Sequence, residues 1–257
     1  LTEKLVVQRW LRPALKRFDI CDQFAFRPTG STTIAMSFCF HHVTRLLEDS
    51  QFVRCFMIDF RKAVDTVNHS MLIDKLKRLN LPSYILNWII NFLTDRLQQV
   101  KIGNNLSGFC NITRSIVQGS GLGPTLYIVM ESDLHPMSNF INLIFKFADD
   151  TNLLVPQITD ISAKGEINNI KYWAFENKME INWDKTKELV FRRPNIRLSI
   201  SLPEPLFNID QVSEARLLGI IISDKFNFTS HVNYLLTLCA QRCYLLKVDS
   251  KVYLHAN

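Results

Sequence analysis

Apolar residues recur at helical spacing in several stretches of the chain and form continuous or alternating runs in others. Helical spacing predicts helices at residues 1–18, 34–48, 72–79, 84–93, 125–134, 161–180 and 229–246. The other runs predict strands at 52–58, 98–102, 109–117 and 188–191, a strand–turn–strand unit over 141–155, and two short strands within 206–224. The mixture predicts an α+β fold with one sizeable core.

The unit over 141–155 carries two adjacent carboxylates, Asp149 and Asp150, between two apolar arms. We expect these residues at the tip of a hairpin, since Asp tolerates turn geometry. Desolvating two like charges is costly unless a cation compensates, and Mg²⁺ prefers carboxylate oxygens. The alternative is a solvated acidic turn without a ligand.

A third carboxylate, Asp59, ends the apolar run 52–58, which is typical of a strand buried on both faces. If that strand and the hairpin are neighbours in one sheet, Asp59, Asp149 and Asp150 converge at its rim. Such a site suits two metal ions that activate a hydroxyl and stabilise a leaving phosphate oxygen. Polymerases and nucleases share this chemistry, so the carboxylates alone do not separate them.

A glycine-rich loop, Gln118-Gly-Ser-Gly-Leu-Gly-Pro124, precedes a predicted helix and offers N–H groups to an anion. No Gly-Lys-Ser/Thr follows, so it is not a Walker motif. Lys185 could protonate a leaving phosphate group. The residues predict metal-dependent phosphoryl or nucleotidyl transfer and do not distinguish further.

Basic residues have two interpretations each. Arg27, between an aromatic pair and a Pro-Thr-Gly turn, could hold a phosphate or make a structural ion pair. A basic cluster could follow a nucleic-acid backbone or form a solvated face; it comprises Lys185, Lys187, Arg192, Arg193 and Arg197.

The bulk composition of the 257 residues is globular, with 47% hydrophobic and 21% charged residues. A formal charge of +6 is compatible with a polyanionic partner. The six cysteines lack Cys-x-x-Cys spacing, and no signal peptide is visible, which favours reduced thiols inside a cell. No apolar run reaches the length of a membrane span. The chain begins within a helical pattern without an initiator Met, which indicates a fragment of a longer protein, and Pro13 should interrupt this first helix.

Five motifs in a fixed order carry a resemblance to a known family. They are Gln23-Phe-Ala-Phe-Arg-Pro28 with Ser31-Thr-Thr33, Phe56-Met-Ile-Asp59 continuing to His69, Gln118–Pro124, Phe147-Ala-Asp-Asp150, and Asn182-Trp-Asp-Lys185-Thr-Lys187. Together they resemble the reverse transcriptase of non-LTR (LINE-type) retrotransposons of the Jockey and CR1 groups. Leu217-Leu-Gly-Ile220 resembles the strand pair that grips the primer in this family.

The resemblance implies a right-hand polymerase palm, a split βαβ, ferredoxin-like antiparallel sheet with helices on one face. Residues 1–50 would be partial fingers, 51–228 the palm with inserted fingers elements at about 70–117, and 229–257 the start of a truncated thumb.

The resemblance also implies an RNA-directed DNA polymerase that joins dNTPs to a DNA primer on an RNA template with two Mg²⁺ or Mn²⁺ ions. Asp59, Asp149 and Asp150 would bind metal, and Lys185 would donate a proton to pyrophosphate. The substrate-binding set would be the Phe60 carbonyl, Val64, Gln118 and Gly119, with Arg27 as the phosphate candidate above. Such a polymerase would work in the nucleus and cytoplasm as a ribonucleoprotein, without a membrane; the sequence indicates no oligomeric state.

The chain departs from the family pattern at several points. Val64 replaces the usual Phe or Tyr under the sugar, which predicts weaker discrimination against ribonucleotides. Val117 replaces a Pro and Gly121 a larger apolar residue. The family's upstream fingers strand and endonuclease domain lie outside this sequence. The alternative function is therefore a catalytically inactive or domesticated copy that binds nucleic acid.

Overall fold

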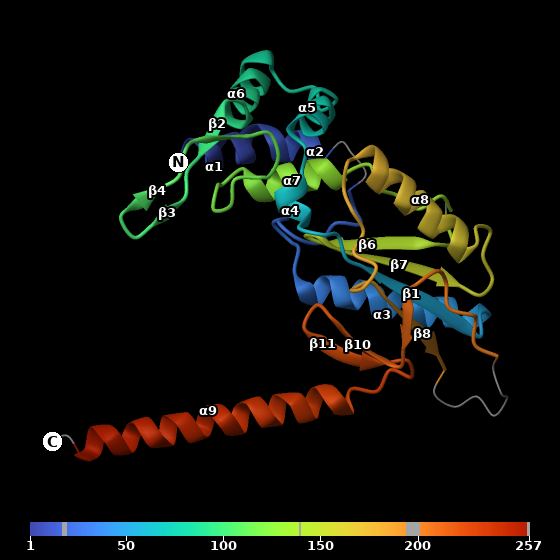
Figure 1. Ribbon diagram of the computed structural model, residues 1–257. Helices are drawn as coiled ribbons and strands as arrows, with labels where there is room; N and C mark the ends of the chain where they lie inside the picture. Colours follow the sequence, from blue (N-terminus) through green and yellow to red (C-terminus); the bar gives the residue numbers. More distant parts are fainter. Residues whose placement is uncertain (17–19, 139, 194–200, 256–257) are drawn as a thin grey trace.

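The computed structural model describes residues 1–16, 20–138, 140–193 and 201–255, and in this part of the chain the largest sheet has five strands in the order β6-β7-β1-β8-β9 (Figure 1). Their bounds are Leu143–Phe147, Asp150–Pro156, Phe52–Ile58, Lys187–Arg192 and Asp210–Val212. The central strand β1 pairs antiparallel with both neighbours, and β8 and β9 are parallel. The predicted central strand and the predicted hairpin are therefore neighbours in one sheet.

Helices cover both faces of this sheet, so the expectation of helices on one face alone was wrong (Figure 1). On one face, Phe56 of β1 belongs to a core with α8 (Ala163–Glu176) and α7 (Gly123–Glu131). On the other face, Cys55 packs with α3 (Thr32–Asp49). The physical reason is that β1 carries apolar side chains on both of its faces, so each face has to be covered.

The first helix is interrupted as Pro13 predicted, although the chain stays helical. It consists of α1 (Thr2–Val6), a π-helical turn η1 (Val7–Leu11) and α2 (Arg12–Leu15), which contains Pro13. Proline lacks an N–H and its ring would clash with a carbonyl one α-turn earlier, and a wider turn relieves both problems. The next helix, α3 (Thr32–Asp49), begins two residues before the predicted 34, because the Ser31 hydroxyl caps it by accepting a hydrogen bond from the Ile34 N–H.

Helices α4 (Ala63–Thr66), α5 (His69–Lys77) and α6 (Ser83–Leu93) lead to a long hairpin. In the hairpin, β2 (Arg96–Gln98) pairs with β5 (Cys110–Ile112), and β3 (Lys101–Ile102) pairs with β4 (Asn105–Leu106). The second predicted strand, 109–117, ends early at Ile112. After it, the N–H of Ile116 donates to the Val64 carbonyl at 3.1 Å, so the chain leaves the hairpin and joins the region after β1.

A second hairpin, β10 (Glu214–Leu217) with β11 (Ile220–Ser223), lies below the sheet beside α3 (Figure 1). Helix α9 (Thr229–His255) then extends away from the rest of the chain (Figure 1). It is longer than the predicted 229–246, because no Gly or Pro follows Leu246 to end it. In the residues described, no helix is both long and apolar enough to cross a membrane.

Candidate active site

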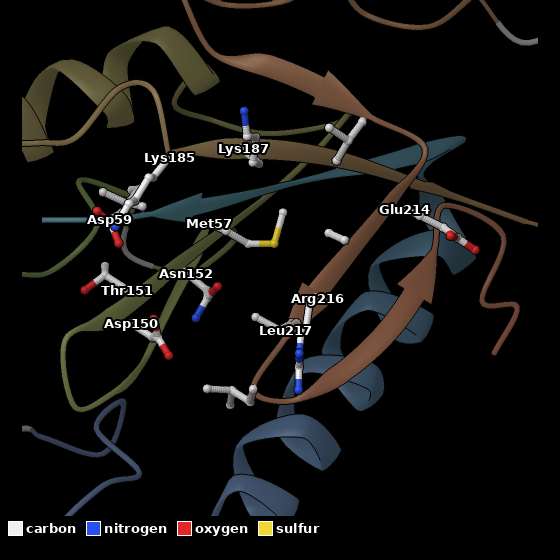
Figure 2. Close-up of a pocket in the computed structure, with 14 residues that line it drawn as sticks. Met57, Asp59, Asp150, Thr151, Asn152, Lys185, Lys187, Glu214, Arg216 and Leu217 are labelled. Carbon is white, nitrogen blue, oxygen red and sulfur yellow. The ribbon is translucent and has the colours of Figure 1, made fainter. Parts of the chain in front are cut away.

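The register between β1 and β7 brings the predicted carboxylates to one rim of the sheet. Ile58 faces Thr151, so Asp59, one residue further along β1, comes level with Asp150. Asp149 lies in the turn between β6 and β7, after Ala148, whose φ is 56°. Figure 2 shows Asp59 and Asp150 on adjacent strands, both facing the same cavity as Lys185. The two strand ends that carry Asp59 and Asp150 therefore lie side by side, as the sequence predicted.

Electrostatics couple the three carboxylates. Burial raises the pKa of Asp150, and the negative charges of Asp149 and Asp59 raise it further. Within the described ranges, no three His, Cys, Asp or Glu side chains are gathered closely enough to hold a metal ion. Three carboxylates on adjacent chain segments fit a hard divalent cation in charge and donor type.

Lys185 lines a cavity of about 550 Å³ together with Asp59, Phe60 and Asp149. The Phe60 side chain is buried and contacts the Trp173 ring with centroids 5.8 Å apart, so only its backbone is placed for the cavity. The buried Thr186 hydroxyl accepts a hydrogen bond from the Asp59 N–H at 3.3 Å and donates to the Asn182 carbonyl at 2.8 Å. Thr186 thereby ties the Asp59 strand end to the segment that carries Lys185.

A third cavity, of about 350 Å³, is also lined by Asp149. Val64, Gln118, Gly119 and Tyr127 line it with Asp149. The Gln118 amide donates to the Asp65 carboxylate at 3.1 Å, which holds the loop against α4. Gly119 has a φ of 80°, a conformation that favours glycine, and an added Cβ would meet nothing within 4 Å. The structure thus gathers the predicted sugar and nucleotide residues around one space.

The glycine-rich loop does hold an anion, but the chain itself supplies it. The Glu3 carboxylate in α1 accepts hydrogen bonds from the N–H groups of Gly121 at 2.5 Å and Leu122 at 3.2 Å. These groups lie at the N-terminus of α7, where a negative charge is favourable. Glu3 therefore fixes the loop to the first helix.

Arg27 makes hydrogen bonds within its own turn. Its Nη1 donates to the carbonyls of Ile20, Cys21 and Gln23, at 3.0, 3.3 and 3.0 Å. A guanidinium engaged with three carbonyls serves to shape its own turn. These bonds hold the turn, and the phosphate contact of Arg27 stays a prediction.

Part of the basic cluster also has internal partners. Lys187 pairs with Asp210 at 2.5 Å and Arg192 with Asp224 at 2.5 Å, while Arg193 donates to the carbonyls of Leu47 and Glu48. These three side chains therefore have partners within the chain, and a nucleic-acid track along the cluster stays a prediction. Arg197 lies outside the described residues.

A buried polar network behind the hairpin was not recognised from the sequence. Glu131 is 1% exposed and accepts a hydrogen bond from the Tyr127 hydroxyl at 2.7 Å. The Gln23 amide reaches Glu131 at 3.4 Å and also contacts the Ala148 backbone. Gln23 belongs to a recognised motif, but the long sequence separation hides this contact. Burial raises the pKa of Glu131 to about 7, with Asp149 and Asp22 adding to the rise and Lys146 and Tyr127 opposing it.

We expect Glu131→Gln to remove a pH dependence of folding stability. The folded chain keeps the Glu131 proton up to a pKa of about 7, whereas an unfolded chain releases it near 4.5. The wild-type free energy of unfolding should therefore fall by up to about 3 kcal/mol between these pH values, and the variant should lack this fall. Urea unfolding at about pH 5 and pH 8 measures both chains. An identical pH dependence in the two chains would contradict the raised pKa of Glu131.

Comparison with protein families gives a match to the model described as "Reverse transcriptase (RNA-dependent DNA polymerase)" over residues 2–222. Among curated proteins, the chain is 28% identical to the probable RNA-directed DNA polymerase from transposon BS of Drosophila melanogaster, over 96% of this chain. It is 27% identical to the RNA-directed DNA polymerase from the mobile element jockey of the same organism, over 90% of this chain. The matches cover 28% and 26% of those relatives, so the chain spans about a quarter of their length.

Solved structures give the same fold. A telomerase from Candida albicans, in complex with the TWJ fragment of telomeric RNA, superposes with a TM-score of 0.62 at 13% identity, over 89% of this chain and 37% of that chain. Apo telomerase from Candida tropicalis superposes with a TM-score of 0.59 at 13% identity, over 88% and 40%. These likenesses confirm the right-hand polymerase fold predicted from the motifs.

Proposed function

Because the chain belongs to the reverse transcriptase (RNA-dependent DNA polymerase) family, we propose that it carries the nucleotidyl-transfer centre of an RNA-directed DNA polymerase from a non-LTR retrotransposon. The observation that supports this most strongly is the strand register, which brings Asp59 level with Asp150 beside the Asp149 turn. Lys185 lies in one cavity next to Asp149, and Gln118 lines another. The jockey relatives are named as polymerases of the same kind.

In this proposal, Asp59, Asp149 and Asp150 hold two Mg²⁺ or Mn²⁺ ions, with the Phe60 carbonyl as a further oxygen donor. Bound divalent ions would activate the primer hydroxyl and stabilise charge on the leaving phosphate. Lys185, exposed at the cavity that Asp59 and Asp149 line, would give a proton to the departing pyrophosphate. Proton donation at this position needs a flexible cationic side chain, which an exposed lysine provides.

The cavity of about 350 Å³ would receive the incoming nucleotide. Gln118 and Gly119 would contact the template base and the nucleotide, and the unhindered backbone of Gly119 allows a close approach. Val64 would face the sugar. The substrates would be dNTPs, a DNA primer and an RNA template.

A template-directed incorporation assay tests this function. The chain should extend a DNA primer on an RNA template with Mg²⁺, adding the complementary dNTP and losing all extension when the metal is chelated. Asp184→Asn is a suitable background control, because Asp184 is highly exposed, with 90% side-chain exposure. Binding of primer–template without any extension would instead support the inactive, nucleic-acid-binding alternative.

Val64→Phe should increase the preference of the polymerase for deoxyribonucleotides. Val64 lines a cavity of about 350 Å³, which leaves room for a ribose 2′-hydroxyl that a phenyl ring would exclude. We expect the ratio of kcat/KM for dNTP over rNTP to rise by about tenfold or more. Single-nucleotide incorporation with matched dNTP and rNTP measures this ratio. Equal ratios in the two chains would remove residue 64 from sugar discrimination.

A further inference from the structure

The Gln23 side chain contacts both backbone polar groups of the residue that precedes Asp149. Its Oε1 accepts a hydrogen bond from the Ala148 N–H at 3.1 Å, and its Nε2 donates to the Ala148 carbonyl at 3.2 Å. Gln23 is 2% exposed, so water does not compete for these bonds. The carboxamide thus pairs with Ala148 as a neighbouring strand would.

A buried acid and two backbone N–H groups surround this carboxamide and fix its orientation. The Gln23 Nε2 also reaches the Glu131 carboxylate at 3.4 Å, and the Tyr127 hydroxyl donates to the other oxygen of Glu131 at 2.7 Å. The N–H groups of Ala25, at 2.9 Å, and Ala148 both donate to the Gln23 oxygen, so the amide nitrogen is the end that faces Glu131. The Gln23 oxygen is consequently directed to the Ala148 N–H.

The backbone around Gln23 is held as firmly as its side chain. The Phe24 N–H donates to the Lys146 carbonyl at 2.8 Å, and the Lys146 N–H donates to the Asp22 carbonyl at 2.7 Å. These bonds place Gln23 beside β6 in a parallel bridge. Lys146, 1% exposed, further pairs with the Asp22 carboxylate at 3.0 Å. The segment 22–24 therefore extends the sheet next to the catalytic hairpin.

The backbone conformation of Ala148 decides where the next carboxylate, that of Asp149, lies. Its φ of 56° is a left-handed conformation that a residue with a Cβ seldom adopts without support from its surroundings. Asp149 follows directly and lines the cavity of about 550 Å³ and the cavity of about 350 Å³. A change at Ala148 would thus swing Asp149 relative to Asp59.

We propose that Gln23 is a positioning residue for nucleotidyl transfer, which clamps Ala148 and thereby sets the Asp149 carboxylate. The proposal rests on the function proposed above. It uses both ends of the carboxamide, since Nε2 donates to the Ala148 carbonyl and Oε1 accepts from the Ala148 N–H. Glutamate keeps the acceptor and loses the donor, and methionine loses both.

Two variants separate the clamp from general stability. Gln23→Met should increase amide hydrogen exchange at Ala148 by about tenfold, since the acceptor is lost. Gln23→Glu combined with Glu131→Gln keeps a donor–acceptor pair between positions 23 and 131, so Ala148 N–H should stay protected. Both variants should lower kcat for single-nucleotide addition by about tenfold to 100-fold, with the KM for dNTP changed by less than about threefold.

Gln211→Met is the matched control for Gln23→Met. The Gln211 amide also lies 3.4 Å from a buried carboxylate, that of Glu188, but it lies on β9 and does not line either cavity beside Asp149. It should keep the wild-type kcat and the wild-type exchange at Ala148.

Wild-type exchange at Ala148 in Gln23→Met, or wild-type kcat in either clamp variant, would overturn the proposal. If the unmodified chain adds no nucleotide, the proposed function fails for this chain. The clamp on the turn is then decided by the exchange measurement alone.

Discussion

Asp59→Asn should reduce primer extension by about 100-fold or more, because losing one metal-binding carboxylate removes several kcal/mol of transition-state stabilisation. Asp59 lies level with Asp150 across the β1–β7 register and contributes to the repulsion that raises the pKa of Asp150. Removing its charge relieves that repulsion, so the variant should not be less stable than the wild type. Single-turnover extension with Mg²⁺ and thermal unfolding without metal measure the two effects.

Asp184→Asn gives the matched control for this change. Its carboxylate has 90% side-chain exposure and makes only a 3.9 Å contact with Arg61. A single exposed pair contributes little to stability. Extension should therefore continue at the wild-type rate. If Asp59→Asn and Asp184→Asn had the same extension rate, Asp59 would not take part in catalysis.

Glu188→Gln should lower the free energy of unfolding by about 3–5 kcal/mol, since it leaves a buried charge without its partner. The Arg54 guanidinium pairs with both carboxylate oxygens of Glu188, through Nε and, at 3.0 Å, through Nη2. The side chains are 10% and 0% exposed. Arg54 also donates to the Glu204 carbonyl at 3.0 Å, a bond that the variant retains. Urea unfolding measures the loss.

Two further chains show whether the loss comes from the unpaired charge. Replacing both partners, Arg54→Met with Glu188→Met, should recover most of the stability, because apolar pairs of similar volume often match a buried ion pair. Asp74→Asn, which breaks the exposed pair with Lys77, should change stability by less than about 1 kcal/mol. A loss in Glu188→Gln no larger than that in Asp74→Asn would contradict the buried pair.

The parts of this site that could be predicted from the sequence are those encoded locally. The apolar arms on either side of Asp149 and Asp150 specify a hairpin, and the apolar run before Asp59 specifies a buried strand. Both strands formed where expected and became neighbours. The ordered motifs predicted in addition that this sheet is a polymerase palm, which hydrophobic periodicity alone does not indicate.

Contacts between distant segments could not be predicted in this way. Gln23 meets Ala148 across 125 residues, and nothing near either residue signals the pairing. Lys187 and Arg192 pair with partners 23 and 32 residues away, which a linear pattern does not reveal. The helices on both faces were missed for the same reason, since α3 reaches the sheet only through the tertiary fold.

The Asp149 carboxylate offers the most direct test of the central claim, which is that the rim of this sheet catalyses RNA-templated DNA synthesis. The measurement is extension of a DNA primer on an RNA template with Mg²⁺, for the wild-type chain and for Asp149→Asn. The account predicts extension by the wild type and a loss of about 100-fold or more in the variant, with primer–template binding retained. Equal extension by the two chains would contradict it.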